Sequence, residues 1–142
     1  MSLQNFIFRK LIKRMFYKPM SITELRNEQA KSTKMMGKLP KDLSLERTEI
    51  SGIPAEWVAH ESADTDKVIL YLHGGGYVAG TLDGYRLLCG TLSEATGMRV
   101  LMPEYRLAPD YPFPAALEDS LSVYAWLLTN GFSAENIIIA GD

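Results

Sequence analysis

Residues 67–77 read Lys-Val-Ile-Leu-Tyr-Leu-His-Gly-Gly-Gly-Tyr, a nearly continuous apolar run that ends in a glycine cluster. Such a run, apolar at successive positions, is typical of a strand that helices bury on both faces. Three successive glycines permit positive φ angles, and they carry no Cβ that would keep a ligand away from the backbone. The stretch therefore predicts a central strand of a parallel sheet, followed by a loop whose amides can bind a ligand.

Downstream of this stretch the sequence alternates between helical and extended patterns. We predict a helix that ends at Gly97, a strand over 99–102, a helix that begins at Pro114, and a last strand over 136–140. This alternation implies right-handed crossovers and a ligand site at the carboxyl ends of the parallel strands. The helical residues expected to face the core are Leu87, Leu88, Leu92 and Ala95, then Leu117, Leu121, Tyr124, Ala125 and Leu128.

Upstream of the stretch we expect an antiparallel pair of strands and two helices. Extended runs over 45–50 and 55–60 flank a turn-rich connection at 51–54. Ser21 and Glu24 have the spacing of a capping box, which predicts a helix that runs toward Met36. Apolar residues over 8–16 recur at helical spacing between basic ones. This second pattern favours a helix packed on a protein core over one bound to a membrane surface.

The composition excludes several classes of partner. The chain has 142 residues and a formal net charge of -2, with no long basic or acidic block, so we expect a small neutral ligand and no nucleic acid. Cys89 is the only cysteine, which precludes an intrachain disulfide and is compatible with the cytoplasm. Arg and Lys interrupt the apolar residues over 6–16, so neither a signal peptide nor a membrane span is expected.

The glycine cluster has two chemical interpretations. Backbone amides turned inward by glycine can stabilise the oxyanion of an acyl-transfer intermediate. Residues 74–79 also fit the G-x-G-x-x-G/A pattern of dinucleotide-binding domains. Against the second interpretation, the first acid after the next strand, Glu104, lies about thirty positions beyond the glycines, whereas a ribose-binding acid is expected about twenty positions on.

Two motifs carry a resemblance to a known family. Residues 73–77 and the run over 105–119 resemble the hormone-sensitive lipase family, which includes the bacterial family IV carboxylesterases. The resemblance covers residues 45–142 and implies an α/β fold. In it, residues 41–142 would form the N-terminal half of an α/β-hydrolase sheet, with antiparallel first strands and then parallel strands with crossover helices. Residues 1–40 would form cap helices over the pocket.

The resemblance also implies roles for individual residues. Gly75 and Gly76 would donate their amides to the oxyanion, while Gly74 and His73 would shape the loop. Gly141 and Asp142 resemble the start of the nucleophile elbow, whose serine, like the triad acid and histidine, would follow later in sequence. The expected contacts to substrate are Tyr77, Phe16 and Met36, among apolar cap residues that include Phe8 and Met35.

The activity implied is the hydrolysis of carboxylic esters with short to medium acyl chains, through a serine acyl-enzyme. No metal or organic cofactor is expected. We expect the chain alone to be inactive, because the triad would lie in a C-terminal portion that is either missing by truncation or present as a separate companion polypeptide beginning at the serine. Whether the protein forms a homodimer is left open. A non-catalytic small-molecule receptor on the same fold is the alternative, because plant hormone receptors resemble this family. Arg106, Glu118 and Asp119 are interpreted as scaffold pairs, and Cys89 as a packing residue.

Overall fold

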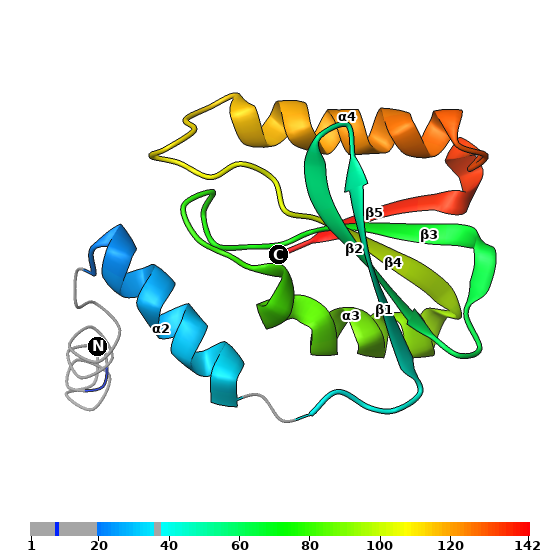
Figure 1. Cartoon of the computed structure of the whole chain (residues 1–142), viewed down its shortest axis with the longest axis horizontal. Coiled ribbons are helices and arrows are strands. Elements are labelled where there is room, and N and C mark those ends of the chain that lie inside the picture. Colours follow the sequence, from blue (N-terminus) through cyan, green and yellow to red (C-terminus); the bar gives the residue numbers. More distant parts are fainter. Residues whose placement is uncertain (1–7, 9–19, 36–37) are drawn as a thin grey trace.

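The computed structural model describes residues 8, 20–35 and 38–142 and forms a mixed five-stranded sheet with helices on both faces (Figure 1). Helix α2 lies to one side, where the loops that follow β3 and β4 emerge (Figure 1). The elements are α2 (Ile22–Met35), β1 (Leu43–Ile50), β2 (Ile53–His60), β3 (Asp64–Leu72), α3 (Leu82–Thr96), β4 (Met98–Pro103), α4 (Ala115–Thr129), the 3₁₀ helix η1 (Ala134–Asn136) and β5 (Ile137–Gly141).

The strand order is β1-β2-β4-β3-β5, with β1, β2 and β4 successively antiparallel and β3 parallel to both β4 and β5. The β1–β2 turn needs two residues with positive φ, which Ser51 (φ 54°) and Gly52 (φ 80°) supply. The predicted fold class is confirmed. The dinucleotide-binding interpretation is wrong, because a Rossmann sheet is mostly parallel and has a different strand order.

The core lies on the two faces of the sheet, one covered by α4 and the other by α3 (Figure 1). Val123 and Leu127 of α4 pack with Leu70 on one face. On the other face, Cys89 of α3 packs with Ile69. Consecutive residues of β3 are therefore buried on opposite sides, as the continuous apolar run predicted.

The predicted buried face of α4 is wrong except at Tyr124, which is partly buried against the core. Its buried residues are Ala115, Asp119, Val123 and Leu127, whereas Leu117, Leu121 and Leu128 are exposed, as is Ala125. The reason is that Asp119 points inward and accepts hydrogen bonds from Arg106, and this contact fixes the rotation of the helix about its axis. A pattern based on hydrophobicity alone places an aspartate outside.

Helix α3 differs from its predicted face for a similar reason. Leu88 and Ala95 are exposed, while Gly90 and Ser93 are buried. The Ser93 hydroxyl accepts a 2.8 Å hydrogen bond from the His60 amide, and a Cβ on Gly90 would collide with the Leu43 side chain. The predicted termination at Gly97 is confirmed, with φ 66°.

Helix α2 begins as predicted. The Ser21 amide donates to Glu24 Oε2 at 2.8 Å, and the Glu24 amide donates to Ser21 Oγ at 3.2 Å, which is the reciprocal geometry of a capping box. Of the predicted helix over 8–16, only Phe8 lies within the described residues. No helix among the described residues is both long and apolar enough to cross a membrane.

Candidate functional site

The glycine loop, residues 73–80, leaves the carboxyl end of β3 beside the end of β5. Within the described residues, the amides of Gly75 and Gly76 have no hydrogen-bond acceptor. Other amides of the loop are engaged: the Gly74 amide donates to Asp142 Oδ1 at 2.7 Å, and the Val78 amide donates to the Gly75 carbonyl at 3.2 Å. The amide of Tyr77 also has no acceptor among the described residues, so the unbonded amides include, but are not limited to, the two that the resemblance assigned to the oxyanion.

The backbone of the glycine loop requires residues without a side chain at two positions, Gly75 and Gly80. Gly75 has a φ of 125°, and a Cβ there would collide with the Ala79 carbonyl. Gly76 has a φ of 63° but faces open space. Tyr77 also has a positive φ, of 61°, which is uncommon for a non-glycine residue and typical of functional sites. Its carbonyl accepts a 2.8 Å hydrogen bond from the Ala108 amide.

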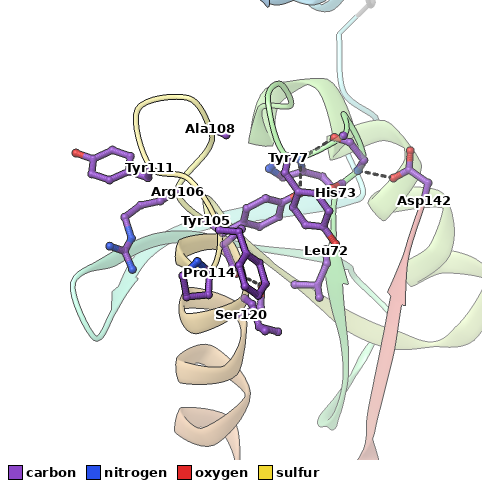
Figure 2. A pocket seen from close by; sticks show the side chains of 15 residues that line it. Leu72, His73, Tyr77, Tyr105, Arg106, Ala108, Tyr111, Pro114, Ser120 and Asp142 are labelled. Atoms are coloured by element: carbon purple, nitrogen blue, oxygen red, sulfur yellow. Dashed lines mark hydrogen bonds between the residues drawn. The ribbon is translucent and has the colours of Figure 1, made fainter.

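A cavity of about 620 Å³ opens beside the glycine loop. Gly76 and Tyr77 line it on one side and Asp142 on another, as Figure 2 shows for the labelled side chains. The size lies within the usual range for small-molecule sites, about 300–1,000 Å³. The β4–α4 loop and the start of α4 supply its apolar walls: Tyr105, Ala108, Tyr111, Phe113, Pro114, Ala116 and Leu117.

The predicted substrate contacts are only partly placed. Tyr77 lines the cavity, whereas Phe16 and Met36 lie outside the described residues. The neighbouring Met35 is 86% exposed, and it is not among the residues that line the cavity. The sequence interpretation missed Tyr111 and Phe113, although both belong to the motif over 105–119.

His73 is buried against Tyr105, with ring centroids 4.3 Å apart (Figure 2). Burial lowers the pKa of His73, with the hydrogen bond to Gly74 opposing the shift, so the ring is neutral at neutral pH. Its Nδ1 lies 3.0 Å from the Gly74 carbonyl, to which it donates when that nitrogen carries the proton. A buried neutral ring bonded to the loop fits the predicted shaping role better than proton transfer.

Asp142 connects the end of β5 to the glycine loop. Besides the Gly74 amide, its carboxylate accepts hydrogen bonds from the hydroxyls of Tyr71 (3.0 Å) and Tyr85 (3.1 Å). Burial and the adjacent carboxylate raise the pKa of both tyrosines, which stay protonated donors. The sequence interpretation missed both: Tyr71 was seen only as part of a strand, and Tyr85 lies 57 residues from its partner.

Arg106 and Asp119 join the β4–α4 loop to α4. The Asp119 carboxylate accepts from the Arg106 amide at 2.8 Å and from Nη2 at 2.7 Å. Burial of Asp119 acts to raise its pKa, but the hydrogen bonds from Arg106 outweigh burial and hold the pKa below its ordinary value. Glu118 lies farther out, 3.5 Å from Nη2. This geometry matches the predicted scaffold pair.

Cys89 is fully buried, and burial raises the pKa of its thiol to about 12. The thiol is therefore protonated at neutral pH and serves packing, as predicted. Among the described residues, no group of three or more His, Cys, Asp or Glu side chains is placed to hold a metal ion.

Comparison with known proteins agrees with this geometry. The profile of a family described as "alpha/beta hydrolase fold" matches residues 69–142. A crystal structure of an esterase from the bacterial hormone-sensitive lipase family superposes with a TM-score of 0.82 at 38% identity, over 92% of this chain and 43% of that one. The chain belongs to the hormone-sensitive lipase family of α/β-hydrolases.

Other known proteins are similar to the chain over part of their length. An acetyl-hydrolase of Streptomyces hygroscopicus is 42% identical over 88 residues, which are 62% of this chain and 29% of that protein. An ethyl acetate hydrolase of Pseudomonas putida is 42% identical over 52% of this chain and 24% of its own length. An esterase/lipase from an uncultured bacterium superposes with a TM-score of 0.82 at 34% identity, over the whole chain and 48% of that structure. The chain thus spans a third or less of the length of the curated relatives that it matches.

Proposed function

We propose that the whole protein that contains this chain hydrolyses carboxylic esters of short to medium acyl chains through a serine acyl-enzyme. The observation that carries the proposal is the pair of amides at Gly75 and Gly76. Neither is bonded to a described residue, and they lie in a loop that borders a cavity beside Asp142. Oriented donors of this kind, aimed at a developing oxyanion, contribute about 2.7–4 kcal/mol each to lowering the barrier of acyl transfer.

In the proposed reaction, the serine expected after Asp142 attacks the ester carbonyl, whose oxygen becomes negative and is held by the amides of Gly75 and Gly76. The triad histidine takes the proton of the serine and returns it to the leaving alcohol, which leaves the acyl group on the serine. Water, deprotonated by the same histidine, then attacks this serine ester, and the proton returns to the serine as the carboxylic acid leaves. The amide of the residue after the serine would be the third donor, and the acid and histidine would come later in the sequence. His73 would support the loop without transferring a proton.

The preference for short to medium acyl chains is supported by the shape of the cavity and by the relatives. Aromatic and aliphatic side chains of the β4–α4 loop wall the cavity near Gly76. Two relatives carry the names acetyl-hydrolase and ethyl acetate hydrolase.

A series of p-nitrophenyl esters from acetate to laurate tests the proposal on the whole protein. We expect turnover that is highest for the shorter chains and that a serine-directed fluorophosphonate abolishes. Residues 1–142 alone should give no turnover, because the serine of the G-x-S-x-G elbow is not among them. A folded whole protein that binds these esters or their acids and hydrolyses none would contradict the proposal and support the receptor alternative.

A further inference from the structure

Helix α2 contacts both loops that border the cavity through one side chain, Arg26. Its Nε donates to the Val78 carbonyl at 2.8 Å, and its Nη2 donates to the Ala108 carbonyl at 2.9 Å. Nη1 also lies 3.2 Å from the carboxylate of Asp110. Val78 belongs to the glycine loop and Ala108 to the β4–α4 loop, so a single guanidinium ties the two together. Five donors in a fixed plane suit arginine to such a junction.

A second side chain of α2 holds the glycine loop two residues farther on. Gln29 Oε1 accepts a 2.8 Å hydrogen bond from the Gly80 amide. Gly80 packs closely on His73, since its φ is 120° and a Cβ there would collide with the imidazole ring. Gln29 therefore fixes the end of the loop at the point where it rests on the histidine.

Among the described residues, Arg26 and Gln29 make all the hydrogen bonds that join α2 to residues 38–142. None of its residues is buried, so it contributes little apolar area to the core. The glycine loop is held at its first residues by Asp142 through the Gly74 amide, and at its last residues by α2. The amides of Gly75 and Gly76 lie between these two anchors.

We infer that Arg26 and Gln29 are positioning residues, through which α2 sets the orientation of the Gly75 and Gly76 amides. The inference rests on the proposed function. Donors that stabilise an oxyanion act only when they are held in place before the reaction, within about 0.5 Å of the productive geometry. Loss of either contact leaves the cavity and the fold in place but lets the loop fluctuate.

The test uses Arg26→Gln and Gln29→Leu in the whole protein, with Lys31→Gln as the matched control. Lys31 lies on the same helix and, among the described residues, pairs only with the exposed Glu28. We expect kcat per titrated active site to fall about 10-fold in each test variant, with KM within about twofold, because the ester is bound equally well before reaction. Arg26→Lys should recover part of the loss, and Lys31→Gln should equal the wild type.

Two further readouts separate positioning from a general structural role. The affinity for a trifluoromethyl ketone, which forms an anionic adduct, should fall in parallel with kcat. Hydrogen exchange of peptides that cover residues 73–80 should accelerate in both test variants and not in the control. Unchanged kcat, a change in KM alone, or unaltered exchange of this segment would overturn the inference. If the wild type hydrolyses no ester, faster hydrogen exchange of residues 73–80 in the two test variants still shows that Arg26 and Gln29 hold the glycine loop. In that case only the proposed function fails.

Discussion

The hydroxyl of Tyr71 donates to the same carboxylate oxygen of Asp142 that accepts the Gly74 amide, at 3.0 and 2.7 Å. Tyr85 occupies the other oxygen at 3.1 Å. The carboxylate is thus held from three directions, and it holds the start of the glycine loop in turn. Hydrogen bonds to a charged group are worth about 1.5–3 kcal/mol each, more than those between neutral groups.

Tyr71→Phe and Tyr85→Phe should each lower kcat by roughly 3- to 10-fold in the whole protein, because Asp142 loses one of the donors that orient it. Tyr124→Phe is the matched control, since this half-buried tyrosine makes no side-chain hydrogen bond to a described residue. Steady-state kinetics with p-nitrophenyl butyrate measures the effect. Equal activity of all three variants would show that the Asp142 contacts do not govern the loop.

Gly76→Ala should fold and retain a measurable, reduced activity, whereas Gly75→Ala should be inactive. An alanine at Gly76 meets open space and costs only the left-handed backbone strain, about 1–2 kcal/mol. An alanine at Gly75 collides with the Ala79 carbonyl, so the loop must move. Gly52→Ala is the control, because Gly52 also has positive φ and open space but lies in the β1–β2 turn. Gly52→Ala and Gly76→Ala should lose similar stability by urea denaturation, and only the latter should lose kcat.

The features of the fold that the sequence predicted correctly are those that depend on residues close together in the chain. The buried strand before His73, the capping box at Ser21 and the stop at Gly97 depend on neighbouring residues, so the sequence predicted them. The rotation of α4 depends on a contact between Arg106 and Asp119, and that of α3 on Ser93 and Gly90. These contacts join distant residues and bury polar or small ones, which hydrophobic periodicity places outside.

The residues of the candidate site also fall into those that a local motif predicts and those that only the fold brings to the site. Gly75 and Gly76 could be assigned from a contiguous motif, and the structure leaves their amides without a partner among the described residues. Tyr71, Tyr85 and Arg26 lie outside the two motifs that carry the resemblance, and each reaches its partner across 52 to 82 residues of sequence. No local pattern marks such partners, because only the folded topology brings them together.

The pKa of His73 makes the stability of the protein depend on pH in a defined direction. Burial lowers this pKa below its ordinary value of 6.5, so just below pH 6.5 the unfolded state binds more protons than the folded state. The free energy of unfolding therefore falls as pH drops through 6.5 toward the lower pKa of the folded state, and this contribution is complete above 6.5. In His73→Gln this contribution is absent, so stability should fall less between about pH 7.5 and pH 5.

Urea denaturation of the wild type and His73→Gln at several pH values measures that difference. If the free energy of unfolding depended on pH equally in the two proteins, the His73 imidazole would not be desolvated as described. The acidic limb of the pH–rate profile should persist in the variant, because the proton-transferring histidine of the proposed mechanism is a different residue.

Removing Arg86 from its ion pair with Glu56 should destabilise the protein far more than breaking an exposed pair nearby. Glu56 is fully buried in β2, and Arg86 binds it through Nε at 2.6 Å and Nη2 at 2.7 Å. Arg86→Met leaves an uncompensated buried carboxylate, which typically costs about 3–5 kcal/mol. Arg47→Met is the matched control: Arg47 lies 3.7 Å from Asp83, which also pairs with Arg86, but its side chain is 75% exposed, so the loss should stay below about 1 kcal/mol. Thermal and urea unfolding should give a clearly lower Tm and a clearly lower free energy of unfolding for Arg86→Met than for Arg47→Met. A loss for Arg86→Met no larger than that for Arg47→Met would mean that water reaches Glu56 and screens its charge.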